Sequence, residues 1–257
     1  MDANTAAQEW AKEIKCEHYS EETDYTDDEG RERRYRCFVD DGIVCGEKWE
    51  AVGNPRVLVV LREARAQIVG ECQVDDGIFS LQEYLKKLKW QGSRTYKPPA
   101  EWIEAIFKRK GYRHEDNIFE HVAVINLKKT PGARRTKRKE LNRFCRDFDG
   151  RLREQIVGIN PNFIILANEY DNFFERIMKD CIAPNKKVRL LSSRKIKNPL
   201  ALYVCKPNYR KEEDPPLLVF NAYHPSARLK NTAAEFEDLL DQYDNLSEQA
   251  FAAEVCI

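Results

Sequence analysis

Hydrophobic and polar positions divide the chain into short apolar runs and longer amphipathic stretches. The runs that would be apolar on both faces of a strand span residues 57–61, 122–125, 163–166 and 217–220. Stretches with helical spacing lie between or after them, at 81–88, 141–157 and 233–243. Strands buried on both faces and connected by helices form a parallel sheet between two helix layers. The pattern predicts a three-layer α/β/α fold around a mainly four-stranded parallel sheet.

Other segments add to this core. Residues 188–191 and 201–205 predict a further pair of strands before the last core strand. Near the N-terminus, 6–16 has the pattern of a short helix, and 35–39 with 43–45 predicts a hairpin closed by Asp40, Asp41 and Gly42. We therefore expect two parts: an N-terminal helix and hairpin extension at 1–50, packed on a single α/β domain at 51–257.

Length and composition agree with one substantial core, since the chain has 257 residues of which 42% are hydrophobic. No stretch approaches the roughly 18 apolar residues that a membrane span needs. The first ten residues also lack the basic-then-apolar order of a signal peptide. These features predict a cytoplasmic protein with no membrane partner.

The eight cysteines include no C-x-x-C pair and no dense cluster, so neither a disulfide framework nor a zinc ribbon is indicated. Cys16, His18, Cys37 and Cys45 have side chains that could bind a metal tetrahedrally if the N-terminal helix packs against the hairpin. The alternative is that these cysteines belong to the core. We expect reduced thiols, no metal and no cofactor.

Charge is balanced overall but unevenly distributed. The chain has 43 basic and 43 acidic residues, and acidic residues are concentrated at 17–29. Residues 128–139 contain no carboxylate and seven cations: Lys128, Lys129, Arg134, Arg135, Lys137, Arg138 and Lys139. Cations this close together repel one another unless they are solvated or face an anion. The segment is therefore either a phosphate-binding surface or a solvated loop and helix start.

Polar residues that could take part in catalysis or binding follow each apolar run. Glu63 comes after the first run, Asn126 and the basic segment after the second, and Asn168 after the third. The fourth run leads to His224, which precedes a proline. Because open α/β sheets bind ligands outside the carboxyl ends of their strands, we expect these residues to converge on one edge of the sheet.

This ordered set resembles the uracil-DNA glycosylase superfamily over about residues 57–228. In one branch of that family the first strand is followed by Gly-Glu-Ala-Pro-Gly, to which Arg62-Glu63-Ala64-Arg65-Ala66 aligns. The same branch continues after its second-strand asparagine with Val-Lys-Cys-Arg-Pro-Pro, which residues 127–132 resemble. The family's last motif, His-Pro-Ser followed by a wedge residue, matches residues 224–228.

The resemblance implies a monofunctional DNA glycosylase that hydrolyses the N-glycosidic bond of a flipped base. Glu63 would handle the attacking water, and His224 would donate a hydrogen bond to the departing base. Residues expected to contact the base or line its pocket are Asn126, Phe79, Arg62, Arg65, Asn168 and Tyr223. Residues expected to contact DNA are Lys128, Lys129, Arg134, Arg135, Ser226, Ala227 and Arg228.

The chain also departs from the family pattern. Arg62 and Arg65 replace a small glycine and a proline, and the iron–sulfur cysteines of the branch are absent. The expected substrate is therefore either a uracil-type lesion or a hypermodified pyrimidine of phage DNA, and the second would imply antiviral defence.

Each residue also has a purely structural interpretation. Glu63 could pair with Arg62 or Arg65 at the surface, Asn126 could cap a turn, His224 could be a hydrogen-bonded histidine at a strand end, and Phe79 could belong to the core. Two other functions stay open for the whole chain. One is a non-catalytic nucleic-acid-binding protein on a glycosylase-like fold. The other is an α/β enzyme for a small phosphorylated substrate, although residues 62–67 lack the glycine-rich turn expected there.

Overall fold

The computed structural model describes most of the chain. The described residues are 23–26, 32–35, 38–65, 78–132, 137–184, 187–191, 200–223 and 232–245. The description below refers to these ranges.

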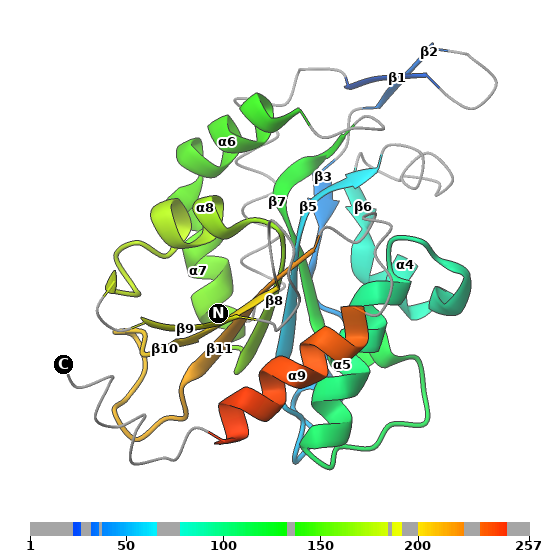
Figure 1. Ribbon diagram of the computed structural model, residues 1–257. Coiled ribbons are helices and arrows are strands. Elements are labelled where there is room, and N and C mark those ends of the chain that lie inside the picture. Colours follow the sequence, from blue (N-terminus) through cyan, green and yellow to red (C-terminus); the bar gives the residue numbers. More distant parts are fainter. Residues whose placement is uncertain are drawn as a thin grey trace.

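A central sheet of seven strands organises the molecule (Figure 1). Its strands, in spatial order, are β4 (Gly42–Ile43), β7 (Ala123–Gly132), β5 (Val57–Arg65), β8 (Phe163–Ala167), β11 (Leu217–Ala222), β10 (Ala201–Cys205) and β9 (Lys187–Leu191). The four strands β7, β5, β8 and β11 run parallel to one another. β4 pairs antiparallel with β7, β10 pairs antiparallel with β11, and β9 pairs antiparallel with β10. The expected four-stranded parallel core and the additional strand pair are confirmed.

Helices cover both faces of this sheet (Figure 1). One face packs against α4 (Leu81–Lys86), α5 (Lys97–Arg109) and α9 (Thr232–Asn245). The other packs against α6 (Arg138–Asp147), α7 (Asp149–Ile159), the short α8 (Tyr170–Asn172) and the π-helical turn that follows it (Phe173–Ile177). The architecture is therefore α/β with a mostly parallel sheet between helix layers.

Alternating side chains of each central strand enter two different cores. In β5, Val57 and Val59 pack with α5 and α9, whereas Leu58 and Val60 pack with α6 and α7. Successive strand residues point to opposite faces, so a strand between two helix layers must be apolar at every position. This requirement explains why the four predicted runs lack a polar face.

Two core strands are longer than the sequence pattern predicts. β5 continues to Arg65, and β7 continues to Gly132. The expected positions of Glu63 and Asn126 in loops beyond their strands are therefore wrong, because both residues lie within strands. Glu63 and Lys128 are register partners in these extensions, and their side chains form an ion pair.

The N-terminal hairpin predicted at 35–45 is also wrong. Instead, β3 (Phe38–Asp40) pairs parallel with β6 (Ile78–Ser80), and β4 joins the central sheet beside β7. A separate antiparallel pair consists of β1 (Thr23–Thr26) and β2 (Glu32–Tyr35). The expected boundary near residue 50 stays a prediction, although β4 lies within the main sheet.

In the described ranges, the predicted helices are found, but one of them is divided into two and α5 was not predicted. The helix expected at 6–16 lies outside the described residues. The segment predicted as one helix at 141–157 forms α6 and α7, which meet at Phe148. Helix α5 begins with prolines at its first turn, where a missing N–H costs no hydrogen bond. Shorter elements are α2 (Gly46–Trp49) and the 3₁₀ turns Trp90–Gly92 and Ile118–His121. In the described ranges, no helix is both long and apolar enough to cross a bilayer.

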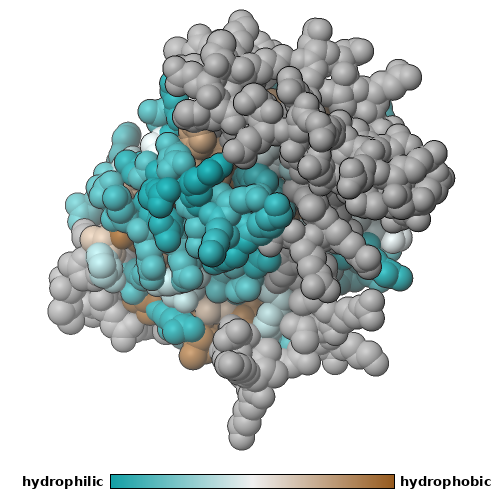
Figure 2. All heavy atoms as spheres, turned by 90° about the horizontal axis from the view of Figure 1, so that it is seen from above, coloured by the Kyte–Doolittle hydropathy of each residue, from teal (hydrophilic) through white to brown (hydrophobic). Residues whose placement is uncertain are grey.

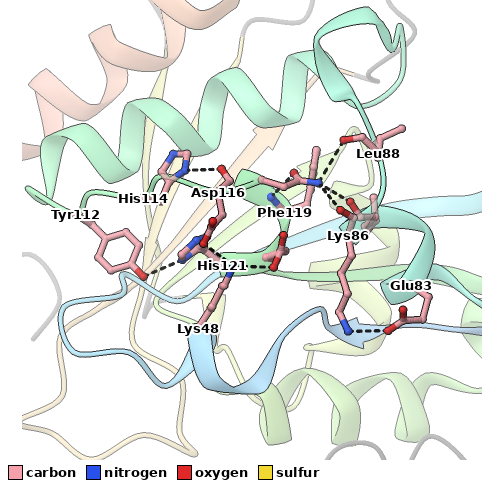
Figure 3. A network of polar contacts seen from close by, with 12 residues as sticks. Lys48, Glu83, Lys86, Leu88, Tyr112, His114, Asp116, Phe119 and His121 are labelled. Carbon is pink, nitrogen blue, oxygen red and sulfur yellow. Dashed lines mark hydrogen bonds and ion pairs between the residues drawn. The ribbon is translucent and has the colours of Figure 1, made fainter.

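A polar network fastens the amino ends of β5 and β7 (Figure 3). Lys48 Nζ lies 2.6 Å from Asp116 Oδ2 and 2.7 Å from Glu120 Oε2. Asn117 Nδ2 donates to three backbone carbonyls, of Leu85, Lys86 and Leu88. These bonds tie the turn before β7 to α2 and to the end of α4.

A buried histidine belongs to the same network. His121 Nδ1 lies 2.9 Å from Tyr112 Oη, and its ring is 5.5 Å from that of His114 (Figure 3). Asn54 Nδ2 donates to the backbone carbonyl of His121 at 2.9 Å. Burial lowers the pKa of His121, and the charges of His114 and Lys48 act in the same direction. This end of the sheet therefore favours a neutral imidazole.

Candidate active site at the carboxyl end of the sheet

The order of the parallel strands marks the carboxyl end as the place for a site. β5, the first of the four in the chain, lies between β7 on one side and β8 on the other (Figure 1). The chain leaves β5 towards β7 on one side and then passes β5 again to reach β8 on the other side. In open α/β sheets, ligands bind at such a switch point, outside the carboxyl ends of the strands.

Glu63 lies near this point and is almost buried. Its side chain is 6% exposed, and Oε2 lies 3.2 Å from Lys128 Nζ on the neighbouring strand. Lys128 also lies 3.5 Å from Glu140 Oε2 in the first turn of α6. The structural interpretation of Glu63 as a surface carboxylate is therefore wrong. Its cationic partner comes from β7.

Asn126 lies one strand away and two residues closer to the amino end, because it is the register partner of Leu61. Strand spacing and rise place it on the order of 8 Å from Glu63 between Cα atoms. Its backbone N–H and its Nδ2 both donate to Asp41 Oδ2, at 2.7 and 3.3 Å. Its Oδ1 is buried and has no hydrogen-bond partner among the described residues. The turn-cap interpretation does not apply, since Asn126 lies inside β7.

Lys129 is a correction to the expected DNA-contacting surface. Its side chain is buried, with Nζ 2.5 Å from Asp41 Oδ1 and 2.9 Å from Gln155 Oε1. Burial lowers the pKa of Lys129, and Asp41 opposes that shift. A lysine enclosed in this way cannot contact phosphate. The sequence pattern missed Asp41 as its partner, although a lone acid pair before a short apolar segment could have drawn attention to it.

A second acid lies beside this pair. Burial raises the pKa of Asp40 to about 6, the charge of Asp41 adds to the effect, and a hydrogen bond from Gln82 opposes it. Asp40 Oδ1 is buried, and no residue that the structure describes forms a hydrogen bond with it. Asp40, Asp41, Asn126 and Lys129 form one cluster. Within the described part of the chain, two buried acceptor oxygens of this cluster have no donor.

Arg62 joins a different group at the switch point. Its Nε donates to Glu169 Oε1 at 2.5 Å, and Arg138 Nη1 donates to the same oxygen at 2.6 Å. Glu169 follows β8, is fully buried and accepts a further bond from Asn172 Nδ2 at 2.8 Å. Arg62 is thus held by Glu169, a residue that the sequence pattern did not single out.

The other residues expected to line the pocket lie in the core, in a side-chain hydrogen bond or in a turn. Phe79 is 3% exposed and packs against Tyr84, with ring centroids 6.0 Å apart, which agrees with the core interpretation. Tyr223 Oη donates to Glu235 Oε2 at 2.9 Å. Asn168 is exposed and has φ 60°, the left-handed conformation of a turn at the end of β8.

Several expected residues lie outside the described ranges. They are His224, Ser226, Ala227, Arg228, Arg134, Arg135, Cys16, His18 and Cys37. For Arg65 the backbone is described as the end of β5, and its side chain is not. Cys45 is a partly buried free thiol. Where side chains are described, no group of three or more His, Cys, Asp and Glu could hold a metal ion.

The described part of the surface at this end is mainly hydrophilic. Figure 2 looks down on the end of the molecule where β5 and β7 terminate, and the described residues visible there are mainly polar or charged. At the start of α6, the exposed residues are Lys137, Arg138 and Lys139. Arg138 keeps 44% of its side chain exposed although it binds Glu169. Part of the expected basic surface thus lies on α6, while Lys129 does not belong to it.

Comparison with known proteins assigns the chain to no family. No protein-family model matches the chain, and no curated protein matches it.

Proposed function

We propose that this protein is a monofunctional DNA glycosylase that uses the carboxyl end of its parallel sheet. The observation that carries the proposal is the placement of Glu63 and Asn126. They lie on neighbouring parallel strands beside the switch point. β11, which leads towards His224, runs parallel in the same sheet with only β8 between it and β5.

The chemistry requires an anion near the sugar and a donor near the base. As the N-glycosidic bond breaks, positive charge develops on the sugar and negative charge on the departing base. A carboxylate at Glu63 would offset the first charge and accept a proton from the attacking water, whose oxygen bonds to C1′. A histidine at position 224 would hydrogen-bond the departing base. That role stays a prediction, because His224 lies outside the described ranges.

The surroundings of Glu63 are compatible with this role. Lys128 contacts Oε2, and no hydrogen bond to Oε1 is found in the described part of the chain. One oxygen is thus fixed by a cation, and the other, which has no hydrogen bond to any described residue, would contact the attacking water. Fixed orientation of the group that handles water is a requirement of general base catalysis.

DNA would be held by the exposed cations at the start of α6. Lys137, Arg138 and Lys139 follow the end of β7 closely in the chain, so a phosphate held by them would lie near the proposed site. Backbone contacts of this type make binding salt-dependent, with a slope that reflects the number of phosphates neutralised. Extruding the target base costs a few kcal/mol, which such contacts help to offset.

The test is release of free bases by the purified full chain. The substrates are DNA containing uracil, an oxidised pyrimidine or glycosylated hydroxymethylcytosine, together with bacterial and modified-phage DNA. Mass spectrometry of the released bases identifies the substrate, and abasic sites are counted in parallel. We expect one base class to be released with equimolar abasic sites. Absence of release from every substrate would overturn the proposal.

A second function is favoured by one observation. Glu63 is 6% exposed and already paired with a cation, as in a fold that has no use for a reactive carboxylate. The alternative is a non-catalytic nucleic-acid-binding protein on a glycosylase-like fold. Salt-dependent DNA binding that is unchanged in Glu63→Gln, with no released base, would select this alternative.

A further inference from the structure

Two arginine side chains from different elements converge on one buried carboxylate. Arg62 Nε and Arg138 Nη1 both donate to Glu169 Oε1, at 2.5 and 2.6 Å. Arg62 lies in β5, Arg138 opens α6, and Glu169 follows β8. Leu61 packs with the α5 side of the sheet, so Arg62, the next residue of the strand, points to the face that α6 and α8 cover (Figure 1). The three side chains therefore meet on this face, at the carboxyl end of the sheet.

The carboxylate of Glu169 is fixed by further contacts. Its side chain is fully buried, and Oε2 accepts a hydrogen bond from Asn172 Nδ2 at 2.8 Å. The same Nδ2 donates to Asn142 Oδ1 of α6 at 3.2 Å. Asn168, just before Glu169, has φ 60°, a conformation that asparagine tolerates and that turns the chain from β8 into α8. The acceptor for both arginines thus has a position set by α6 and α8.

The charges of this group do not balance. Two guanidinium ions share one carboxylate, which leaves one positive charge in excess. Both lie within hydrogen-bond distance of the same oxygen, and like charges this close repel each other. Asp171 Oδ2 lies 3.8 Å from Arg138 Nη2, but its side chain is 66% exposed, so this pair offsets little of the excess. An anion bound between the two guanidinium groups would offset it.

Both arginines also reach the surface with donors to spare. The side chain of Arg62 is 21% exposed and that of Arg138 is 44% exposed. A guanidinium has five N–H donors. Within the described part of the chain, no residue accepts a hydrogen bond from the two terminal nitrogens of Arg62. Planar guanidinium groups that are fixed on one side and open on the other suit the oxygens of a phosphate, which need not enter the core.

We propose that Arg62 and Arg138 form a binding site for one phosphate group, and that Glu169 is its positioning residue. Two sources supply the same chemistry: a phosphodiester within a nucleic-acid strand, and the terminal phosphate of a strand or nucleotide. The inference goes beyond the proposed function, because Arg138 becomes half of a built site instead of one of three separate cations. The site also does not depend on whether a base is released.

The test of binding follows the side-chain ¹⁵Nε–¹Hε signals of arginines in the full chain. The probes are inorganic phosphate and a thymidine trinucleotide with or without a 5′-phosphate. Signals of Arg62 and Arg138, assigned through Arg62→Lys and Arg138→Lys, should shift and saturate. Arg109 is the control, because it is 30% exposed and pairs with Asp241 and Asp244 in the other helix layer. Absence of a saturable shift with all three probes, or an equal shift of Arg109, would overturn the proposal.

The same titration distinguishes the two sources of phosphate. For a terminal phosphate, inorganic phosphate should bind, and removal of the 5′-phosphate should weaken binding of the trinucleotide by at least about tenfold. For a phosphodiester, the two trinucleotides should bind equally. None of these measurements uses catalysis, so absence of base release would overturn the glycosylase proposal without changing these affinities.

Arg138→Lys tests whether a fork of donors or only positive charge binds the phosphate. The substitution keeps the charge but replaces the planar guanidinium by an ammonium. We expect the affinity for the bound probe to fall about 10- to 100-fold. Arg109→Lys, the matched substitution in the other helix layer, should leave it unchanged. Equal affinity in Arg138→Lys and the wild-type chain would contradict the built site.

Glu169→Met tests the positioning role through the sign of its effect. Loss of a negative charge beside two cations would strengthen anion binding if charge alone mattered. If Glu169 holds the arginines in place, binding should instead weaken, and we expect at least about tenfold in the folded variant, with folding checked by circular dichroism. Unchanged or tighter binding would overturn the positioning role. If this variant does not fold, Arg138→Lys decides, because its side chain is partly exposed.

Discussion

The two ends of the central sheet use polar residues in different ways. At the amino end, partly exposed charges such as Lys48 and Glu120 pair at the surface, and the side-chain amides of Asn54 and Asn117 donate to backbone carbonyls. At the carboxyl end, complete ion pairs are buried, as in Asp41 with Lys129. The first arrangement fastens turns. The second encloses charge where the strand order marks a ligand site.

The two arrangements also differ in what they contribute to the free energy of folding. Buried ion pairs are weak contributors to stability because both ions lose their hydration, whereas amide bonds to carbonyls satisfy groups that would otherwise be unpaired. Among the described residues, buried polar atoms without a hydrogen-bond partner occur at both ends, on Asp40 and Asn126 at the carboxyl end and on His121 Nε2 at the amino end. The cost that distinguishes the carboxyl end is therefore the burial of a complete ion pair, and a region that accepts this cost is a stronger candidate for function than one that avoids it.

The largest effect is expected for Lys129→Met. This change leaves the buried carboxylate of Asp41 without its cation, and we expect the free energy of unfolding to fall by roughly 3–5 kcal/mol. Urea denaturation measures the change. The double variant Asp41→Asn, Lys129→Met should recover most of the loss. A single variant as stable as wild type would show that the pair is not enclosed as described.

At the amino end, the largest effect is expected for Asn117→Ala. The substitution removes the donor for three backbone carbonyls and the acceptor for Phe119 N, and we expect a loss of roughly 1–3 kcal/mol. Hydrogen exchange of the amides in α4 and at the start of β7 should increase with it. Base release at a temperature where the variant is folded should stay within about twofold of wild type. A large specific loss of activity would break the distinction between the two ends.

The two ends should respond to pH with opposite signs. The pKa of Asp40 is raised to about 6, so its contribution to stability is full below the unfolded value of 3.8 and is lost as pH rises through 6. The pKa of His121 is lowered from 6.5, so its contribution is present above 6.5 and is lost as pH falls below that value. Relative to wild type, Asp40→Asn should therefore gain roughly 1–2 kcal/mol between pH 4.5 and 7.5, and His121→Gln should lose stability over the same interval. Unfolding free energies at these two pH values test both signs.

The smallest effect is expected for Lys48→Met. Its ion pairs with Asp116 and Glu120 are partly exposed, and such pairs contribute about 0–1 kcal/mol. The melting temperature should change little, and any loss should shrink further in high salt. A loss as large as that of Lys129→Met would mean that the amino end encloses charge to the same degree.

The sequence pattern predicted the strands of the core but not their lengths. Runs such as 57–61 are apolar at every position, which only a strand between two layers requires. Arg62–Arg65 and Lys128–Gly132 contain charged residues, and they continue the strands with those charges paired, as in Glu63 with Lys128 and Lys129 with Asp41. A pattern of single residues cannot show such pairing, since the partners are far apart in the chain.

The pairing of β3 with β6 and the ion-pair partners of Lys129 and Arg62 could not be predicted from the sequence for a related reason. β3 has only three residues and pairs with β6, which comes nearly forty positions later. Asp41 and Glu169 become partners of Lys129 and Arg62 only after the sheet has formed. In contrast, Glu63 and Asn126 were placed at the correct end of the sheet, because the ends of parallel strands converge by topology alone.

The most direct test of the central claim compares two matched substitutions, Glu63→Gln at the carboxyl end and Glu120→Gln at the amino end. Single-turnover release of the base identified by the substrate panel is measured for both, with DNA binding recorded in parallel. The account predicts a loss on the order of 10³-fold in Glu63→Gln with binding retained, and a rate within about twofold of wild type in Glu120→Gln. Equal rates in the two variants would contradict it.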